Sequence, residues 1–284
     1  MMRGAKTLFW FICSLTLVGT VPALSAADDL DALLAAQPDE VKARYAGRHP
    51  SETLSFFGVK PGMTVVEAFP GGGWYSKILK AWLGSEGKLI GADYAVEMYP
   101  KFNFYDDAFL EAKKTWVKTW TAGSEAWGEG ADVAAFHFGS MPDEMKGTAD
   151  VVLLVRALHN VARYENDGGY MSKALNDVMQ VLKPGGMVGV VQHMAPDANS
   201  DKWADGNNGY LKKAFVMEAL VAAGFEFVGE STINENPADQ PSEKEFVWRL
   251  PPSFYGFGDD AELKAKYAAI GESNRMTLLF KKPE

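Results

Sequence analysis

Two acidic residues and a run of glycines have the spacing of a site for a nucleotide-type cofactor. Glu67 lies near the end of an apolar segment, Gly71, Gly72 and Gly73 follow it, and Asp93 comes 20 residues after Gly73. Glycines let a backbone approach a ligand closely, and a helix that starts after them directs free N–H groups at it. An acid placed like Asp93 can accept hydrogen bonds from a ribose diol. The pattern predicts an adenosyl cofactor or NAD.

Glu67 helps to choose between these two cofactors. A carboxylate beside the glycine turn would repel a pyrophosphate, and a low local dielectric would strengthen that repulsion. A sulfonium cofactor with a free amino group would instead be attracted. Each residue also has a plainer interpretation, since the glycines fit a tight turn and Asp93 fits a helix cap. Their joint spacing favours the cofactor site.

His159 and His193 are the residues that we expect to lie at the reacting end of the site. Each follows or ends an apolar segment, and an imidazole with a pKa near 6.5 suits general-base work. Both also fit structural roles, because His159 and Asn160 could hold their own loop closed. Arg156 could bind a substrate carboxylate or, as we prefer, an internal acid such as Glu67. The histidines have no metal-ligand spacing, so we predict no metal site.

Segments of strand and helix character alternate along most of the chain, which predicts an α/β fold with a doubly wound, mostly parallel sheet. Ligands of such sheets bind beyond the carboxyl ends of the strands, where Glu67, Asp93 and both histidines would lie. The strand at 149–155 is apolar without alternation, as expected when both faces are covered. The other expected strands are 64–68, 88–92, 132–136, 187–191, 225–230 and 275–280, and the main expected helices are 74–83, 104–119, 171–182 and 211–223.

Four segments, 65–73, 91–93, 149–155 and 181–186, carry motifs in a recognisable order. They resemble the motifs of class I S-adenosylmethionine-dependent methyltransferases. Within that superfamily the chain is most similar to a group of predicted exported methyltransferases of bacteria. The resemblance covers essentially everything after residue 26. The features shared with that group are the turn at 70–75, the cluster of Arg156, His159 and Asn160, the dipeptide Gly224-Phe225 and the segment 270–277.

The resemblance implies a seven-stranded sheet with an antiparallel last strand and S-adenosyl-L-methionine as cofactor. The chain departs from the family pattern at Phe69, which occupies the position where the family usually has the first glycine of the turn. Ser140 occupies the place where many of these enzymes have an acid or amide near the adenine, although a plain loop is an equal alternative. The implied cofactor-binding residues are Glu67, Phe69, Gly71, Gly72, Gly73, Asp93 and Ser140.

The first 26 residues have the layout of a secretory signal peptide. Arg3 and Lys6 precede the uncharged apolar run 8–21, and small residues follow it. A retained membrane anchor is the alternative, but the run is short for a spanning helix. Residues 27–60 then form a helical cap and 61–284 the methyltransferase domain. Cleavage would remove Cys13, the single cysteine, which suits an exported and periplasmic protein without stable membrane association.

The charge balance weighs against a nucleic-acid partner. The whole chain has a net charge of −9, and nucleic-acid-binding surfaces are usually basic. We therefore expect a small or neutral acceptor, whose methyl group arrives by in-line displacement. The alternatives are a NAD-dependent oxidoreductase and a non-catalytic binding protein that retains the methyltransferase fold. The sequence does not define the acceptor atom or the oligomeric state.

Overall fold

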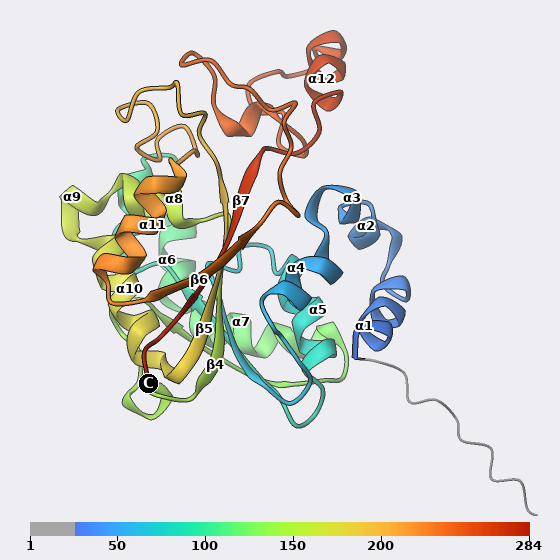
Figure 1. The fold of residues 1–284 in the computed structure, drawn as a ribbon, viewed down its shortest axis with the longest axis vertical. Helices are drawn as coiled ribbons and strands as arrows, with labels where there is room; N and C mark the ends of the chain where they lie inside the picture. The colour runs from blue at the N-terminus through green and yellow to red at the C-terminus, as the bar shows by residue number, and fades with distance from the viewer. Residues whose placement is uncertain (1–25) are drawn as a thin grey trace, which may run out of the picture.

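A seven-stranded sheet forms the centre of the computed structural model, which describes residues 26–284 (Figure 1). The strand order is β3-β2-β1-β4-β5-β7-β6, and β7 alone runs antiparallel to its two neighbours. This arrangement confirms the predicted Rossmann-like methyltransferase fold. The strands are β1 (Thr64–Ala68), β2 (Lys88–Asp93), β3 (Asp132–His137), β4 (Ala149–Val155), β5 (Leu182–His193), β6 (Glu226–Ser231) and β7 (Arg275–Lys281).

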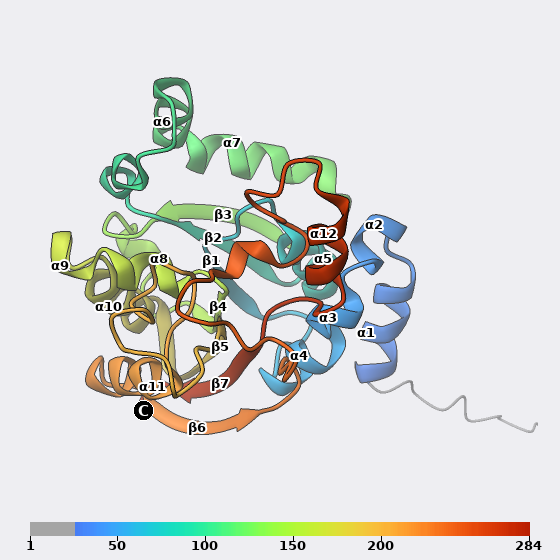
Figure 2. The same cartoon turned by 90° about the horizontal axis from the view of Figure 1, so that it is seen from above.

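Helices cover both faces of the sheet, as the view from above shows (Figure 2). The helices α8, α10 and α11 cover one face, and α1, α4, α5 and α7 cover the other. The helices are α1 (Ala26–Ala35), α2 (Asp39–Lys42), α3 (Tyr45–Arg48), α4 (Pro50–Phe56), α5 (Trp74–Leu83), α6 (Asp107–Lys114), α7 (Trp116–Gly123), α8 (Leu158–Arg163), α9 (Glu165–Gly168), α10 (Tyr170–Val181), α11 (Lys213–Ala222) and α12 (Ala261–Ala268). Short 3₁₀ helices are η1 (Val96–Phe102), η2 (Ser124–Trp127), η3 (Asp143–Met145) and η4 (Val247–Arg249).

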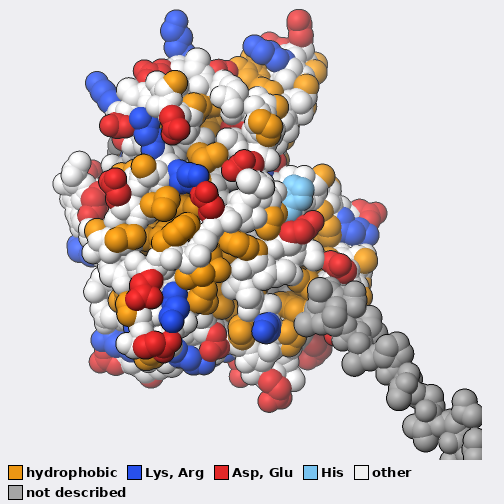
Figure 3. Space-filling view, in the orientation of Figure 1, with side chains coloured by type: hydrophobic (Ala, Val, Ile, Leu, Met, Phe, Trp, Pro, Cys, Tyr) orange, Lys and Arg blue, Asp and Glu red, His pale blue; other side chains and the backbone are white. Residues whose placement is uncertain are grey.

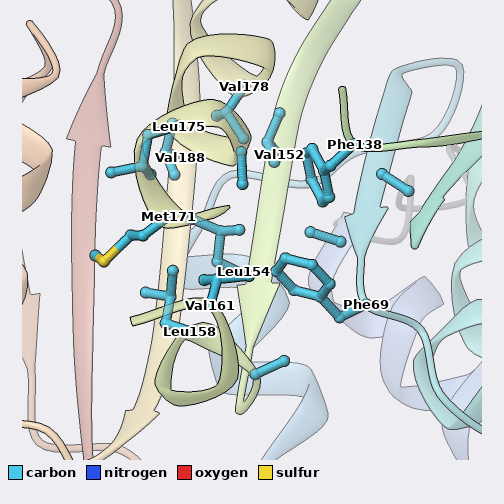
Figure 4. Close-up of a cluster of buried hydrophobic side chains, with 14 of the residues drawn as sticks. Phe69, Phe138, Val152, Leu154, Leu158, Val161, Met171, Leu175, Val178 and Val188 are labelled. Atoms are coloured by element: carbon cyan, nitrogen blue, oxygen red, sulfur yellow. The ribbon is translucent and has the colours of Figure 1, made fainter. Parts of the chain in front are cut away.

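Each face of the sheet has its own hydrophobic core. On the α8 and α10 side, Val152 and Leu154 of β4 pack against Val161, Met171 and Leu175 (Figure 4). On the other side, α1 and α4 pack against α5 and the sheet, where Phe57 lies directly over Gly189 of β5. The N-terminal helices are thus joined to the sheet through a shared core. The predicted division of the chain at residues 26 and 60 stays a prediction.

Two elements differ from the sequence-based expectation. The helix expected at 104–119 is two helices, because the backbone at Thr115 leaves helical geometry between Lys114 and Trp116. Asp106 starts α6 by accepting a hydrogen bond from the Phe109 amide, a standard N-cap. Strand β5 begins at Leu182 rather than 187, since the expected turn at 183–186 is a bulge within the strand, with Gly185 at φ 71°.

The segments between β5 and β7 form a lid above the carboxyl ends of the parallel strands (Figure 1). We call residues 195–212 and 232–274 the lid. Its centre is a buried network in which the Tyr210 hydroxyl bonds the Asp239 carboxylate, 2.9 Å away, and Arg249 pairs with the same carboxylate at 2.6 Å. The irregular stretch 234–242 supplies Asp239 to this network.

The surface mixes charged side chains of both signs. Acidic and basic groups are interspersed on the face seen in Figure 3. Among the described residues, no helix is both long and apolar enough to cross a membrane. The predicted signal peptide, 1–26, falls on residues that lie outside the described part of the chain, apart from Ala26.

Candidate active site

A cleft of about 690 Å³ opens where the carboxyl ends of β1, β2, β4 and β5 meet the N-terminal helices and the lid. Such a volume is within the usual range of ligand sites, roughly 300–1,000 Å³. The cleft is lined by five of the predicted site residues on its sheet side, Glu67, Phe69, Gly71, Gly72 and Asp93, and by both predicted histidines, His159 and His193.

The glycine turn opens directly onto the cleft. Gly71 and Gly73 have positive φ angles of 54° and 72°, a conformation that costs a residue with a Cβ roughly 1–2 kcal/mol. Gly71 and Gly72 line the cleft, and a Cβ at Gly72 would meet nothing within 4 Å. Gly73 instead forms the N-terminal boundary of α5. The turn therefore leaves backbone and open space facing a ligand, as a cofactor cradle requires.

Glu67 is a buried acid without a cationic hydrogen-bond partner. It is 4% exposed, and the Ser76 hydroxyl donates a hydrogen bond to its carboxyl, 2.5 Å away. Burial raises the pKa of Glu67 to about 8, although Ser76 and nearby Arg156 oppose that rise. Among the described residues no salt bridge reaches Glu67, so the carboxyl is largely protonated at neutral pH and available to a cationic ligand group.

The turn accommodates Phe69 because the side chain points away from the turn and packs in the hydrophobic core. The residue adopts φ 56°, and its ring stacks on Tyr94 with 4.4 Å between ring centroids. Figure 4 shows the ring directed toward Phe138 and Leu154, inside the hydrophobic core. The side chain that stands in place of a glycine thus packs on the sheet and leaves the rest of the turn free.

Asp93 lies at the end of β2, where a ribose-binding acid is expected. Its carboxylate pairs with Lys113 of α6 at 2.8 Å and accepts a second hydrogen bond from the Tyr94 amide. Lys113 belongs to the same cleft wall. A ribose diol would therefore share or replace the Lys113 contact, which makes α6 part of the cofactor side of the cleft.

Ser140 is apart from the other predicted residues. Its side chain is exposed and does not line the cleft, and its amide bonds the His137 carbonyl in a turn after β3. The neighbouring Gly139 amide is held by Asp177 of α10 at 2.6 Å. The role of Ser140 near an adenine stays a prediction, and its surroundings match the plain-loop alternative.

His159 and His193 come together at the far side of the cleft, with 5.5 Å between ring centroids. His193 Nδ1 lies 2.5 Å from the Ser273 hydroxyl, and His159 Nδ1 lies 3.4 Å from Gln192 Oε1. Burial lowers the pKa of His159 to about 4, and burial with His159 and Arg156 nearby lowers the pKa of His193 well below 6.5. Both rings are therefore neutral at pH 7, and their lowered pKa values make them weaker bases than the sequence suggested.

The sequence did not predict a cluster of arginines on the wall beside the histidines. We call Arg44, Arg48, Arg156 and Arg275, together with Glu272, the arginine cluster. Glu272 is bonded by Arg44, lies 3.2 Å from Arg275 and 3.6 Å from both Arg48 and Arg156. Glu272, rather than Glu67, is thus the acid with which Arg156 pairs. The sequence offered two signals for this cluster: the four-residue spacing of Arg44 and Arg48, and the segment 270–277, which contains Glu272 and Arg275. Only the fold brings these segments together.

The comparisons with known proteins show similarity of fold alone. The chain matches no family model and no curated protein. Among solved structures it is similar to the [4+2]-cyclase SpnF, with TM-score 0.49 and 16% identity over 84% of this chain and 81% of that one. It is also similar to a SAM-dependent methyltransferase from Aquifex aeolicus, with TM-score 0.45 and 17% identity over 73% and 93% of the two chains. A geranyl diphosphate methyltransferase in complex with GPP and sinefungin gives TM-score 0.47 and 15% identity over 81% and 75%. Similarities at such low sequence identity and TM-score do not assign an activity.

Proposed function

We propose that the protein transfers a methyl group from S-adenosyl-L-methionine to a small acceptor. The observation that carries this proposal is Glu67, a buried carboxyl beside an open glycine turn, with no cationic partner among the described residues. A free amino group or a sulfonium placed there would favour the ionised carboxylate and pair with it. Asp93, at the end of the neighbouring strand in the same cleft, is placed for a ribose.

The proposal gives each part of the cleft a task. The bound donor supplies a methyl group on a sulfonium, and the protein mainly has to align the acceptor with it. Good alignment contributes on the order of 7–11 kcal/mol, so a strong base is not required. Neutral His159 or His193 can take a proton from an acceptor that carries one. The lid residues Trp248 and Pro251 border the cleft and would limit the access of water.

Calorimetry with the purified chain tests the proposal directly. S-adenosylhomocysteine should bind with one equivalent per chain, and Glu67→Gln and Asp93→Asn should each weaken it about tenfold or more, as expected for a lost charge-assisted contact. Lys88→Met, an exposed residue at the start of β2 and outside the cleft, is the control and should leave binding unchanged. If S-adenosylhomocysteine does not bind at millimolar concentration, the proposal is wrong. Binding without transfer to any acceptor would favour a non-catalytic binding protein.

A NAD-dependent oxidoreductase is the second candidate, and the structure strengthens it at one point. A protonated Glu67 would not repel a pyrophosphate, and Arg48 lies beside Trp74 at the start of α5, where a pyrophosphate could bind. Thermal unfolding distinguishes the two cofactors. Protection by NAD, without protection by S-adenosylhomocysteine, would select the oxidoreductase.

Export to the periplasm is proposed from the sequence of residues 1–26 alone. Mass spectrometry of the protein from a periplasmic extract tests it. A mature N-terminus at residue 27 is the expected result, and an intact N-terminus in the cytoplasmic fraction would contradict export.

A further inference from the structure

The wall of the cleft opposite the glycine turn carries an excess of positive charge. Four guanidinium groups of the arginine cluster share one carboxylate, that of Glu272, which leaves three positive charges without an ion-pair partner in the described part of the chain. Three of these arginines, Arg44, Arg48 and Arg156, line the cleft, whereas Arg275 bonds backbone carbonyls. This excess stands out in a chain whose net charge is −9.

The cluster is also short of hydrogen-bond acceptors. Arg48 is 7% exposed, and its Nε and Nη1 atoms have no hydrogen-bond partner among the described residues; Nε of Arg156 has none either. Burial and the neighbouring arginines lower the pKa of Arg48 to about 9 and that of Arg275 to about 10, so both remain cationic at pH 7. Buried charges without partners are costly, which indicates that an anion belongs beside them.

The donor supplies at most one anionic group to this cluster. S-adenosylmethionine carries a sulfonium, an ammonium and one carboxylate, so its binding adds a positive charge to the cleft. The acid placed to receive the cationic part is Glu67, and Asp93 already faces Lys113. Even if the donor carboxylate offset one of the three charges, an excess would remain, and this excess favours an anionic second substrate.

We infer that the acceptor is an oxyanion, a small molecule that carries a carboxylate or phosphate group, and that Arg44, Arg48 and Arg156 bind this group. Guanidinium forks match the planar or tetrahedral arrangement of such oxygens and can bind them with paired hydrogen bonds. Arg156 precedes His159 by three residues and is close enough to both histidines to affect their titration. The anionic group would thus hold the acceptor with its reacting atom over His159 and His193. This inference rests on the proposed methyl transfer and narrows the expectation of a small or neutral acceptor.

Inorganic phosphate is the probe for the test, titrated at constant ionic strength and followed by calorimetry and thermal unfolding. Wild-type protein should bind one phosphate saturably, with chloride unable to replace it. Arg48→Met and Arg156→Met should each weaken phosphate at least about tenfold, and Arg156→Lys should recover part of the loss. Lys88→Met is the charge control, because Lys88 is exposed at the start of β2, at the opposite end of that strand from the cleft, and should change the affinity by less than about twofold. Arg44→Met, at the partly exposed rim, serves where a buried variant does not fold.

S-adenosylhomocysteine and 5′-methylthioadenosine, which lacks the amino-acid part, separate the two possible sources of an anion. Both should bind the arginine variants as they bind the wild type, and saturating phosphate should not compete with them. An S-adenosylhomocysteine affinity that falls about tenfold in Arg48→Met and Arg156→Met, while 5′-methylthioadenosine is unaffected, would assign the cluster to the donor carboxylate and overturn the inference.

Two further results would overturn it. One is the absence of saturable phosphate binding by wild-type protein that binds S-adenosylhomocysteine, which refutes the anion subsite alone. The other is equal weakening by Lys88→Met and Arg156→Met, which indicates a general charge effect. If S-adenosylhomocysteine does not bind the wild type, the proposed function fails, and the assignment of the anion to an acceptor fails with it even when phosphate binds.

Discussion

Glu67 shows how burial can prepare a single residue for its ligand. In the free protein its raised pKa keeps the carboxyl largely protonated, and only a nearby cation makes ionisation favourable. The same residue is thus neutral in the free protein and anionic beside an ammonium group. This behaviour gives two measurable consequences, one for binding and one for stability.

Donor binding should release a proton from Glu67. Because its pKa of about 8 falls when an ammonium group arrives, S-adenosylhomocysteine binding at pH 7 should release up to about one proton. Calorimetry in buffers of different ionisation enthalpy measures the release. Glu67→Gln should abolish it, and 5′-methylthioadenosine, which has no amino group, should release none from the wild type. Equal release by Glu67→Gln would show that another group titrates.

Glu67 should also make the free protein less stable at alkaline pH. Its folded pKa is raised above the unfolded value of 4.5, so the folded state binds more protons between the two values. The stabilising contribution is complete below pH 4.5 and is lost as pH rises to about 8. Denaturant unfolding of wild type and Glu67→Gln from pH 5 to pH 9 checks this. The difference between the two should shift in favour of the variant as pH rises, and a constant difference would contradict the pKa.

At the scale of elements, the close fit of α4 against the sheet determines how the N-terminal helices sit beside the cleft. Phe57, just after α4, packs on Gly189 of β5, where a Cβ would come within 2.5 Å of the ring. Arg48 of α3 is only two residues before α4, so the same packing positions part of the arginine cluster. A glycine in the middle of a strand therefore has a packing reason here.

Gly189→Ala should destabilise the protein and disturb the cleft. Overpacking of a tight core costs roughly 1–3 kcal/mol, and the displaced α4 would move Arg48. The matched control is Gly229→Ala in β6, where a Cβ would meet nothing within 4 Å. Urea unfolding should show a loss for Gly189→Ala and little change for Gly229→Ala. Equal effects would indicate that strand position, not the Phe57 contact, decides the cost.

At the scale of the whole molecule, one buried network joins parts of the lid that are distant in sequence. Tyr210, Asp239 and Arg249 are each at most 2% exposed, and Asp239 also accepts a hydrogen bond from the Asn274 amide, next to the arginine cluster. The lid therefore reaches the site wall through a few polar contacts. The hydrophobic cluster inside the lid is small.

Asp239→Asn should loosen the lid. It removes the charge that balances buried Arg249, and breaking a buried ion pair in this way typically costs about 3–5 kcal/mol. Lys213→Met is the control, because its pair with Glu230 is exposed and should be worth less than about 1 kcal/mol. Thermal unfolding and amide hydrogen exchange in residues 195–212 measure the effect. Unchanged exchange in the lid would show that the network is not what holds it.

The sequence by itself determined the order of strands and helices along the chain, because apolar segments and glycine or proline turns are local signals. Glu67, the glycine turn and Asp93 were also recognisable from local signals, because the turn and the strand ends on either side of it are close to one another in the sequence. The break at Thr115 and the early start of β5 were missed, because each depends on small backbone changes that tertiary packing selects.

Only the tertiary structure decided what surrounds these residues. It brought His159 to His193, directed Phe69 into the core and gathered Arg44, Arg48, Arg156 and Arg275 around Glu272. No local pattern encodes these contacts, because their members come from the N-terminal helices, the end of β4 and the start of β7. Burial then lowered the pKa of both histidines, which keeps their rings neutral at pH 7. The sequence thus indicated where a donor would bind, and the fold indicated what kind of acceptor its charges favour.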